Sequence, residues 1–193
     1  MARWRPGSTG RLQQAAIELF TENGYDATTV AEIAERAGVT ERTFFRHYGD
    51  KREVLFAGQQ EFQSGFVDAI TDAPPGTPAM ELSARALDAA SRALQEARGR
   101  EHARARYAII SAHAPLRERE QLKLAVLAQA VTDALVIRGI PDLPAHLAGD
   151  VVVSVFSTAF ARWIAPGETR DLLDLQHEAL AELANLAGTI TAA

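Results

Sequence analysis

A short run of polar and basic side chains is the part of this sequence best suited to chemistry. Residues 41–47 supply a carboxylate, a hydroxyl, an imidazole and two guanidinium groups, on Glu41, Thr43, His47, Arg42 and Arg46. Phe44 and Tyr48 are four residues apart, so a helix would place both rings on one face and the polar set opposite. Guanidinium, hydroxyl and imidazole groups hydrogen-bond base edges and phosphates. The pattern is therefore typical of the reading helix of a helix-turn-helix.

A second short helix must precede this one and hold it in place. Thr29 and Glu32 are three residues apart, which is the spacing of a capping box at a helix start. Apolar residues then recur at helical spacing, at Val30, Ile33, Ala34 and Ala37. Gly38 suits a left-handed turn position, and Thr40 can cap the helix after it. These residues predict two helices joined by a tight turn.

Residues 8–56 resemble the DNA-binding domain of the tetracycline repressor (TetR) family. The resemblance rests on the order of its parts: a first helix closed by Gly24-Tyr25, the segment TTVAEIAERAGV, the segment TFFRHY, and Lys51 opening a fourth helix. It implies an all-helical homodimer that binds a palindromic operator in double-stranded DNA through its small N-terminal domain. It also implies a repressor whose larger C-terminal domain pairs the subunits and holds a small-molecule inducer.

The resemblance also implies roles for individual residues of the two short helices. The side chains expected to reach base edges in the major groove are those of Glu41, Arg42 and Thr43. The side chains expected to hold phosphates are those of Thr29, Thr40, His47 and Lys51. Phe45 departs from the tyrosine that many family members carry, so one expected phosphate bond is lost, and Arg46 can supply another. Arg3 and Arg5 are expected either to reach the minor groove or to form a tail.

Two other classes of protein compete with this interpretation. A helical-bundle enzyme with a di-iron site requires paired Glu-x-x-His motifs, and the nearest match is a single Asp174-x-x-His177. The sequence contains no serine nucleophile elbow, phosphate-binding glycine loop or HExxH motif. A helical adaptor without DNA binding would leave the polar face of residues 40–47 unexplained. We therefore expect no catalytic residue, no metal and no cofactor.

Composition agrees with a DNA-binding protein of the cytoplasm. The chain contains no cysteine, which fits a reducing compartment. Its N-terminus does not resemble a signal peptide, and no charge-free apolar run reaches the roughly 20 residues that cross a bilayer. The net charge is −5, but residues 1–52 carry 8 basic against 7 acidic side chains. The acidity therefore belongs to the part expected to face away from DNA.

The periodicity predicts an all-α fold of about nine helices in two domains, a DNA-binding domain over residues 1–52 and a ligand-binding and dimerisation domain over 53–193. Besides the two short helices, we expect helices over residues 9–22, 50–70, 79–98, 100–113, 115–139, 144–165 and 168–187. The segment VVVSVF at 151–156 has strand propensity, but its long unbroken surroundings favour a helix. Gly58 and Gly65 lie inside the helix over 50–70, where close packing of a neighbour is the favoured explanation and a hinge the alternative.

The larger domain offers residues for a ligand pocket and for pairing. The pocket set comprises Phe62, Phe66, His102, Tyr107, His113, Phe156 and Phe160. His102 and His113 are eleven apart and would project from one side of a helix; separate surface or capping roles remain open for each, as does a core role for the rings. We expect the subunits to pair through residues 144–187, where apolar side chains exceed what one bundle can cover. The inducer is expected to act through the fourth helix.

Overall fold

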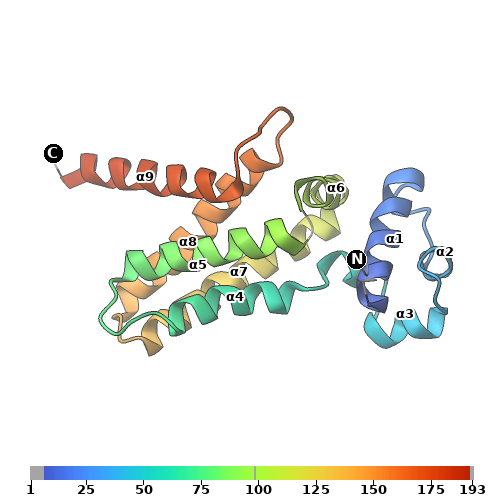
Figure 1. The fold of residues 1–193 in the computed structure, drawn as a ribbon, viewed down its shortest axis with the longest axis horizontal. Coiled ribbons are helices and arrows are strands. Elements are labelled where there is room, and N and C mark those ends of the chain that lie inside the picture. The colour runs from blue at the N-terminus through green and yellow to red at the C-terminus, as the bar shows by residue number, and fades with distance from the viewer. Residues whose placement is uncertain (1–6, 98, 192–193) are drawn as a thin grey trace, which may run out of the picture. The chain divides into compact units, whose positions relative to one another are not determined.

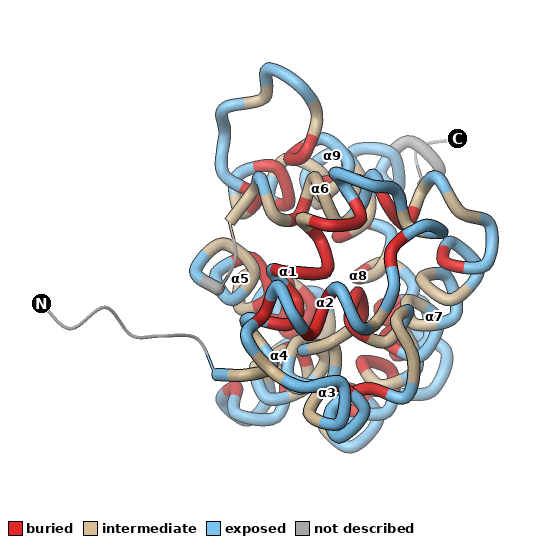
Figure 2. Tube along the Cα trace, turned by 90° about the vertical axis from the view of Figure 1, so that its right-hand side faces the viewer, coloured by how far each residue is buried: buried red, intermediate tan, exposed pale blue. Residues whose placement is uncertain are grey.

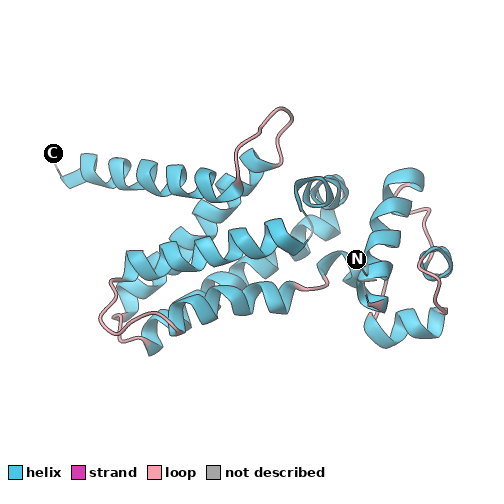
Figure 3. Cartoon of the chain, in the orientation of Figure 1, coloured by secondary structure: helices cyan, strands magenta, loops and turns pink. Residues whose placement is uncertain are grey.

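The fold is built from α-helices, as the periodicity predicts. A computed structural model describes residues 7–97 and 99–191 (Figure 1). The helices of the first half are α1 (Ser8–Asn23), α2 (Val30–Arg36), α3 (Glu41–His47) and α4 (Gln59–Thr71). Those of the second half are α5 (Ala79–Ala97), α6 (Gly99–Ala112), α7 (Ala114–Ile137), α8 (Asp142–Trp163) and α9 (Leu172–Thr191). Figure 3 shows that helices and loops make up the whole of this described part. The Arg3 and Arg5 arm lies outside the described residues.

The fourth helix begins later than the sequence suggests. Asp50 caps as expected, because its carboxylate accepts hydrogen bonds from the backbone N–H groups of Arg52 and Glu53 at 2.8 and 3.1 Å. This cap starts only a 3₁₀ turn, Glu53–Phe56. Gly58 then takes φ +79°, a left-handed conformation that no α-helix interior allows, and α4 starts at Gln59. The prediction of one continuous helix over 50–70 is therefore wrong.

Two further sequence interpretations are resolved by the helices. VVVSVF lies inside α8, so the helical interpretation of this segment is confirmed. A Cβ built on Gly65 would meet nothing within 4 Å, so close packing does not explain that glycine. Close packing occurs instead at Gly149 of α8, where a Cβ would lie 2.3 Å from Thr132 Oγ1 and 2.8 Å from the Ala128 carbonyl oxygen. Helices α7 and α8 therefore cross in near backbone contact.

The chain packs as two compact units. The first comprises residues 1–59 and 105–117, and the second comprises 60–104 and 118–193. The first unit encloses a core in which α1 contributes Leu12, Ala16 and Phe20, and in which Ile110 of α6 is also buried. Figure 2 shows α1 with buried positions on one side and exposed positions on the other. Residues 105–112 of α6 thus share a hydrophobic core with the N-terminal helices.

The second unit is a helical bundle with a larger apolar core. Its fully buried residues include Phe66 of α4, Leu87 of α5 and Trp163 of α8. One buried polar pair crosses this core, because the hydroxyl of Ser91 on α5 donates to the side-chain carbonyl of Gln176 on α9. The helices of this unit are therefore fixed by apolar packing and by at least one buried hydrogen bond.

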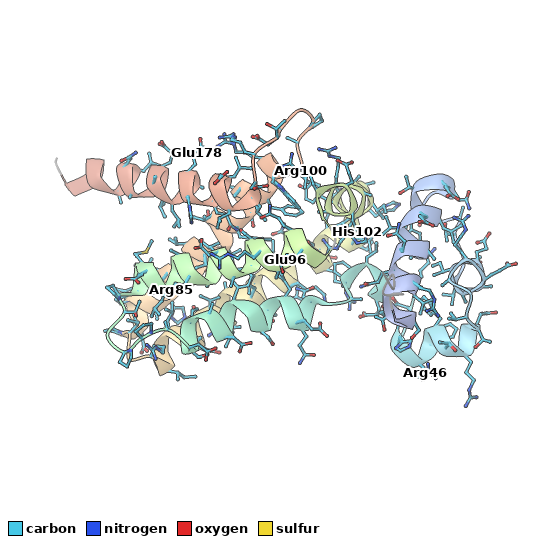
Figure 4. The ribbon with its side chains drawn as sticks, viewed as in Figure 1. Arg46, Arg85, Glu96, Arg100, His102 and Glu178 are labelled. Atoms are coloured by element: carbon cyan, nitrogen blue, oxygen red, sulfur yellow. The ribbon has the colours of Figure 1, made fainter. Side chains whose placement is uncertain are left out.

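Two arginines of α6 hold the connection between α8 and α9. Arg104 donates from Nε to the carbonyl oxygen of Ile164 at 2.7 Å and from Nη2 to that of Ala165 at 3.2 Å. Arg100 donates to the carbonyl oxygens of Glu168 and Arg170, and its guanidinium lies over the ring of Trp163 (Figure 4). Arg104 therefore caps the carboxyl end of α8, and Arg100 holds the loop that follows it.

Helix α8 is the one helix of the described residues that is long and apolar enough to cross a bilayer. Length and composition alone meet this criterion, and a core helix of a globular domain meets it equally. Val152, Phe156 and Trp163 of α8 are buried in the core of the second unit. Packing within the protein therefore accounts for the apolar residues on the buried side of this helix.

Candidate nucleic-acid interface

Helix α2 is started by the capping box that the sequence predicts. The backbone N–H of Glu32 donates to Thr29 Oγ1 at 3.3 Å, and the Glu32 carboxylate accepts from the Thr29 backbone N–H at 2.7 Å and from its hydroxyl at 2.8 Å. These hydrogen bonds lower the pKa of Glu32. At the other end of α2, Gly38 takes φ +67° and the N–H of Val39 donates to the Ala34 carbonyl. Both ends of α2 are thus fixed by contacts between residues that are close in the chain.

Helix α3 is anchored by its two aromatic residues and leaves its polar side exposed. Phe44 is fully buried and Tyr48 is 7% exposed, with ring centroids 5.4 Å apart. The Thr40 hydroxyl caps the helix by accepting from the backbone N–H of Thr43 at 3.2 Å. At 100° per residue, Arg42 and Arg46 project opposite to Phe44, and both are exposed.

The remaining predicted DNA contacts flank this arginine face. Glu41 and His47 are exposed, and Phe45 leaves 54% of its surface in solvent. Figure 4 marks Arg46 on α3. An exposed phenylalanine beside two arginines offers an apolar surface to a sugar or a thymine methyl group. The exposed face of α3 therefore combines two guanidinium groups, one carboxylate, one imidazole and one phenyl ring.

His47 has a partner that the sequence does not reveal. Its Nε2 lies 2.9 Å from the hydroxyl of Ser8 at the start of α1. Arg11 of α1 donates from Nε to the carbonyl oxygen of Ala37 at the end of α2. These two contacts join residues 39 and 26 positions apart in the chain, so no local pattern announces them. They tie the first turns of α1 to both short helices.

Lys51, which the resemblance assigns to a phosphate, makes hydrogen bonds within the protein. Its ammonium donates to the carbonyl oxygens of Tyr25, Asp26 and Thr28 at 2.8, 3.2 and 3.0 Å. It also lies 4.5 Å from the centroid of the Tyr25 ring. An ammonium has three N–H donors, and here all three are directed at the loop after α1. The structure therefore gives Lys51 the role of fixing this loop.

The expected ligand residues fall into two groups. The four phenylalanines Phe62, Phe66, Phe156 and Phe160 form one cluster in the second unit, with successive ring centroids 5.1 to 6.0 Å apart. His102 also belongs to the second unit, whereas Tyr107 and His113 belong to the first. His113 comes after the end of α6 at Ala112, so the prediction that one helix carries both histidines is wrong. Its ring instead lies 4.9 Å from that of Tyr25.

Comparison with known proteins identifies the helix-turn-helix. Residues 12–57 match the family described as "Bacterial regulatory proteins, tetR family". The transcriptional regulator TcmR from Streptomyces glaucescens is 38% identical over 79 residues, which cover 41% of this chain and 35% of TcmR. The chain thus spans about a third of the length of the curated relatives it matches.

Solved structures extend the likeness to most of the chain. The repressor FadR from Thermus thermophilus, in complex with lauroyl-CoA, is 25% identical with a TM-score of 0.56, and the match covers 91% of this chain and 93% of that one. FadR from Bacillus subtilis, in complex with stearoyl-CoA, shares the fold at 20% identity and a TM-score of 0.58, covering 89% and 94%. Residues 12–57 thus carry a helix-turn-helix of the TetR family, and the chain has the fold of TetR-family regulators.

Proposed function

We propose that this chain is a DNA-binding repressor that acts as a homodimer on a palindromic operator in the cytoplasm and is released by a small molecule. The observation that carries the proposal is the exposed face of α3. Arg42 and Arg46 project from a helix whose opposite face, Phe44 and Tyr48, is locked into a core. Rigid support lowers the entropy lost when such side chains engage a base or phosphate. The alternatives are a helical enzyme and an adaptor that does not bind DNA. The relatives TcmR and FadR are regulators, which favours the repressor over both alternatives.

The DNA-binding domain is proposed to be residues 1–52, with 53–193 binding the ligand and pairing the subunits. Arg42 reads a base in each half-site, with Glu41 and Thr43 beside it. Thr29, Thr40, Arg46 and His47 position the helix on phosphates. A phosphate at Thr29 would lie beside the negative carboxylate of Glu32, which already accepts the hydrogen bond from the Thr29 backbone N–H. Arg46 is therefore the strongest phosphate ligand of the set.

The inducer is proposed to be an apolar molecule that lies against the phenylalanine cluster of the second unit. The two FadR proteins were solved with acyl-CoA molecules, which carry long apolar chains. Phe62 and Phe160 are the partly buried members of the cluster, and Phe66 is fully buried. A ligand wedged against these rings changes DNA affinity only by its differential affinity for two conformations, typically about 5–150-fold.

Coupling to DNA cannot run along one unbroken fourth helix, because Gly58 separates α4 from the 3₁₀ turn. Helix α6 provides another connection, since residues 99–104 group with the second unit and 105–112 with the first. We propose that both segments transmit the ligand signal. Phe62→Ala should then weaken induction while ligand-free operator binding is kept.

Pairing is proposed to use the outer face of α8 together with α9. Val152, Val155 and Phe156 point into the chain's own core and are unavailable for a partner. A different stripe of α8 faces outward at spacings of three and four residues. Its exposed members are Leu143, Leu147, Ser154, Thr158 and Ala161, and the half-buried Val151 lies between them. Removing residues 168–193 should abolish dimerisation and operator binding together, as measured by sedimentation.

Binding to selected genomic fragments tests the function. The protein is mixed with sheared DNA of its source, retained fragments are sequenced, and a shared palindrome is sought. A palindrome whose binding is lost in Arg42→Ala and kept in Arg85→Ala supports the proposal. Arg85 is a suitable control because it is an exposed arginine of α5 that pairs with Glu81. Retention of no fragment, or equal retention by the Arg42 variant, would refute sequence-specific reading by α3.

A further inference from the structure

A cavity of about 500 Å³ opens in the first unit. One wall is the end of α1 with the loop after it, and the other is the second half of α6 with His113. The apolar lining comprises Phe20, Ala105, Ala108, Ile109 and Ala112. Three of these residues are alanines, whose small side chains leave room along α6 for a flat or slender apolar ligand.

The polar lining of the cavity contains two hydrogen-bond acceptors. His113 Nδ1 lies 2.8 Å from the Ile109 carbonyl oxygen. A carbonyl only accepts, so Nδ1 carries a proton, and in the neutral form of the ring Nε2 is an acceptor. Nε2 lies 3.8 Å from the carboxylate of Asp26, which is too far for a direct hydrogen bond. The Asp26 side chain is 89% exposed and the His113 side chain 26% exposed.

The Lys51 ammonium is bonded to the backbone of the same loop and not to this pair of acceptors. It donates to the carbonyl oxygens of Tyr25, Asp26 and Thr28. The other polar side chains of the lining, those of Thr21, Asn23 and Tyr25, are uncharged. A ligand group that enters between Asp26 and His113 therefore meets one negative charge and one lone pair. A carboxylate or phosphate would be repelled there, whereas an N–H⁺ group would be bound.

We propose that this cavity binds a small protonated amine carried on an apolar body. The ammonium donates to the Asp26 carboxylate and to His113 Nε2, and the apolar body lies on the alanine wall of α6. The site is distinct from the phenylalanine cluster and selects the opposite charge from an acyl-CoA. It does not depend on the proposed repressor function, because binding alone defines it.

Titration calorimetry of the full chain with 4-phenylbutylamine tests the site, with 4-phenylbutyrate and 4-phenylbutan-1-ol as anionic and neutral analogues. Ala108→Leu fills the cavity, and Ala125→Leu is its control on an exposed position of α7. Asp26→Asn removes the charge, and Asp68→Asn is its control on an exposed position of α4. Thermal unfolding verifies that each variant is folded, and either test variant suffices if the other fails to fold.

The amine should bind the wild-type protein and both controls more tightly than either analogue does. Asp26→Asn should weaken the amine by up to about five-fold, as loss of an exposed ion pair does, and should leave the alcohol unaffected. Ala108→Leu should abolish binding of all three. Absence of amine binding to the wild type, equal binding of the butyrate, or full amine affinity in both test variants would each overturn the proposal.

Discussion

Replacing Lys51 separates a structural role from a DNA-contacting one. Lys51→Ala removes hydrogen bonds from a charged donor to the part-buried carbonyl oxygens of Tyr25 and Thr28, and a more exposed one to Asp26. A hydrogen bond to a charged group contributes about 1.5–3 kcal/mol, and water can replace part of each. Two part-buried bonds at the low end of that range give a loss of about 3 kcal/mol. For a chain of this length the midpoint of thermal unfolding should fall by about 6–12 °C.

A phosphate contact would have a different signature. It predicts nearly unchanged stability and a plot of log K against log salt flattened by about 0.9 per contact, or about 1.8 for two subunits. The structure predicts the reverse for Lys51: a large loss of stability and an unchanged slope at temperatures where the variant is folded. Lys51→Met keeps the apolar stem and should be destabilised similarly, since the carbonyls lose the same donors.

Arg46→Ala is the matched comparison for Lys51→Ala. Arg46 is exposed on α3, so its loss should flatten the salt slope with little effect on unfolding. Calorimetry measures the midpoint of thermal unfolding, and fluorescence anisotropy with labelled operator over a range of salt concentrations measures the salt slope. Both are measured for the wild type, Lys51→Ala, Lys51→Met and Arg46→Ala. A Lys51→Ala protein with wild-type stability and a flattened salt slope would show that the ammonium leaves the loop to bind DNA.

Three other perturbations test the geometry. Arg42→Ala should cost about 1–3 kcal/mol of operator affinity and relax preference at one symmetric pair of positions; unchanged affinity across all single-base operator variants would contradict this. Gly149→Ala should lower the free energy of unfolding by about 1–3 kcal/mol, because its Cβ would lie 2.3 Å from a threonine hydroxyl of α7. Gly65→Ala, where a Cβ meets open space, should raise the free energy of unfolding by up to about 1 kcal/mol. Urea unfolding that ranks the two variants the other way would be inconsistent with the packing. Hydrogen bonds from Arg170 lower the pKa of Glu168 to about 2, so the stabilisation from this pair should be present above the ordinary value of 4.5 and be lost as pH falls toward 2; an NMR midpoint near 4.5 for Glu168 would disprove the pairing.

Local patterns in the sequence predicted local structure well. The Thr29–Glu32 capping box and the Thr40 cap concern residues three apart, and both form as expected. The prediction of one helix over 50–70 was wrong although its Asp50 cap forms. The backbone conformation of Gly58 decides whether the helix continues. A glycine accepts helical and left-handed conformations alike, so its residue type did not reveal which would occur.

Contacts between distant residues could not be predicted from spacing. Lys51 was assigned to DNA because it matches a position at which the TetR family holds a phosphate. Its actual partners lie 23 to 26 residues earlier in the chain, in a loop whose path only the folded core defines. His113 likewise looked like a helix residue aligned with His102, yet it lies beyond the last turn of α6 and contacts Tyr25.

The buried pair of Ser91 and Gln176 sets the register of α9 against α5. Both side chains are fully buried, so the hydrogen bond adds a polar restraint to the apolar packing of the two helices. A shift by one helical turn, about 5.4 Å, would separate the pair and leave both polar groups unpaired in the core, at about 1–3 kcal/mol for each. The hydrogen bond thus excludes other registers of α9. If α9 pairs the subunits, the same hydrogen bond determines which of its side chains face the partner.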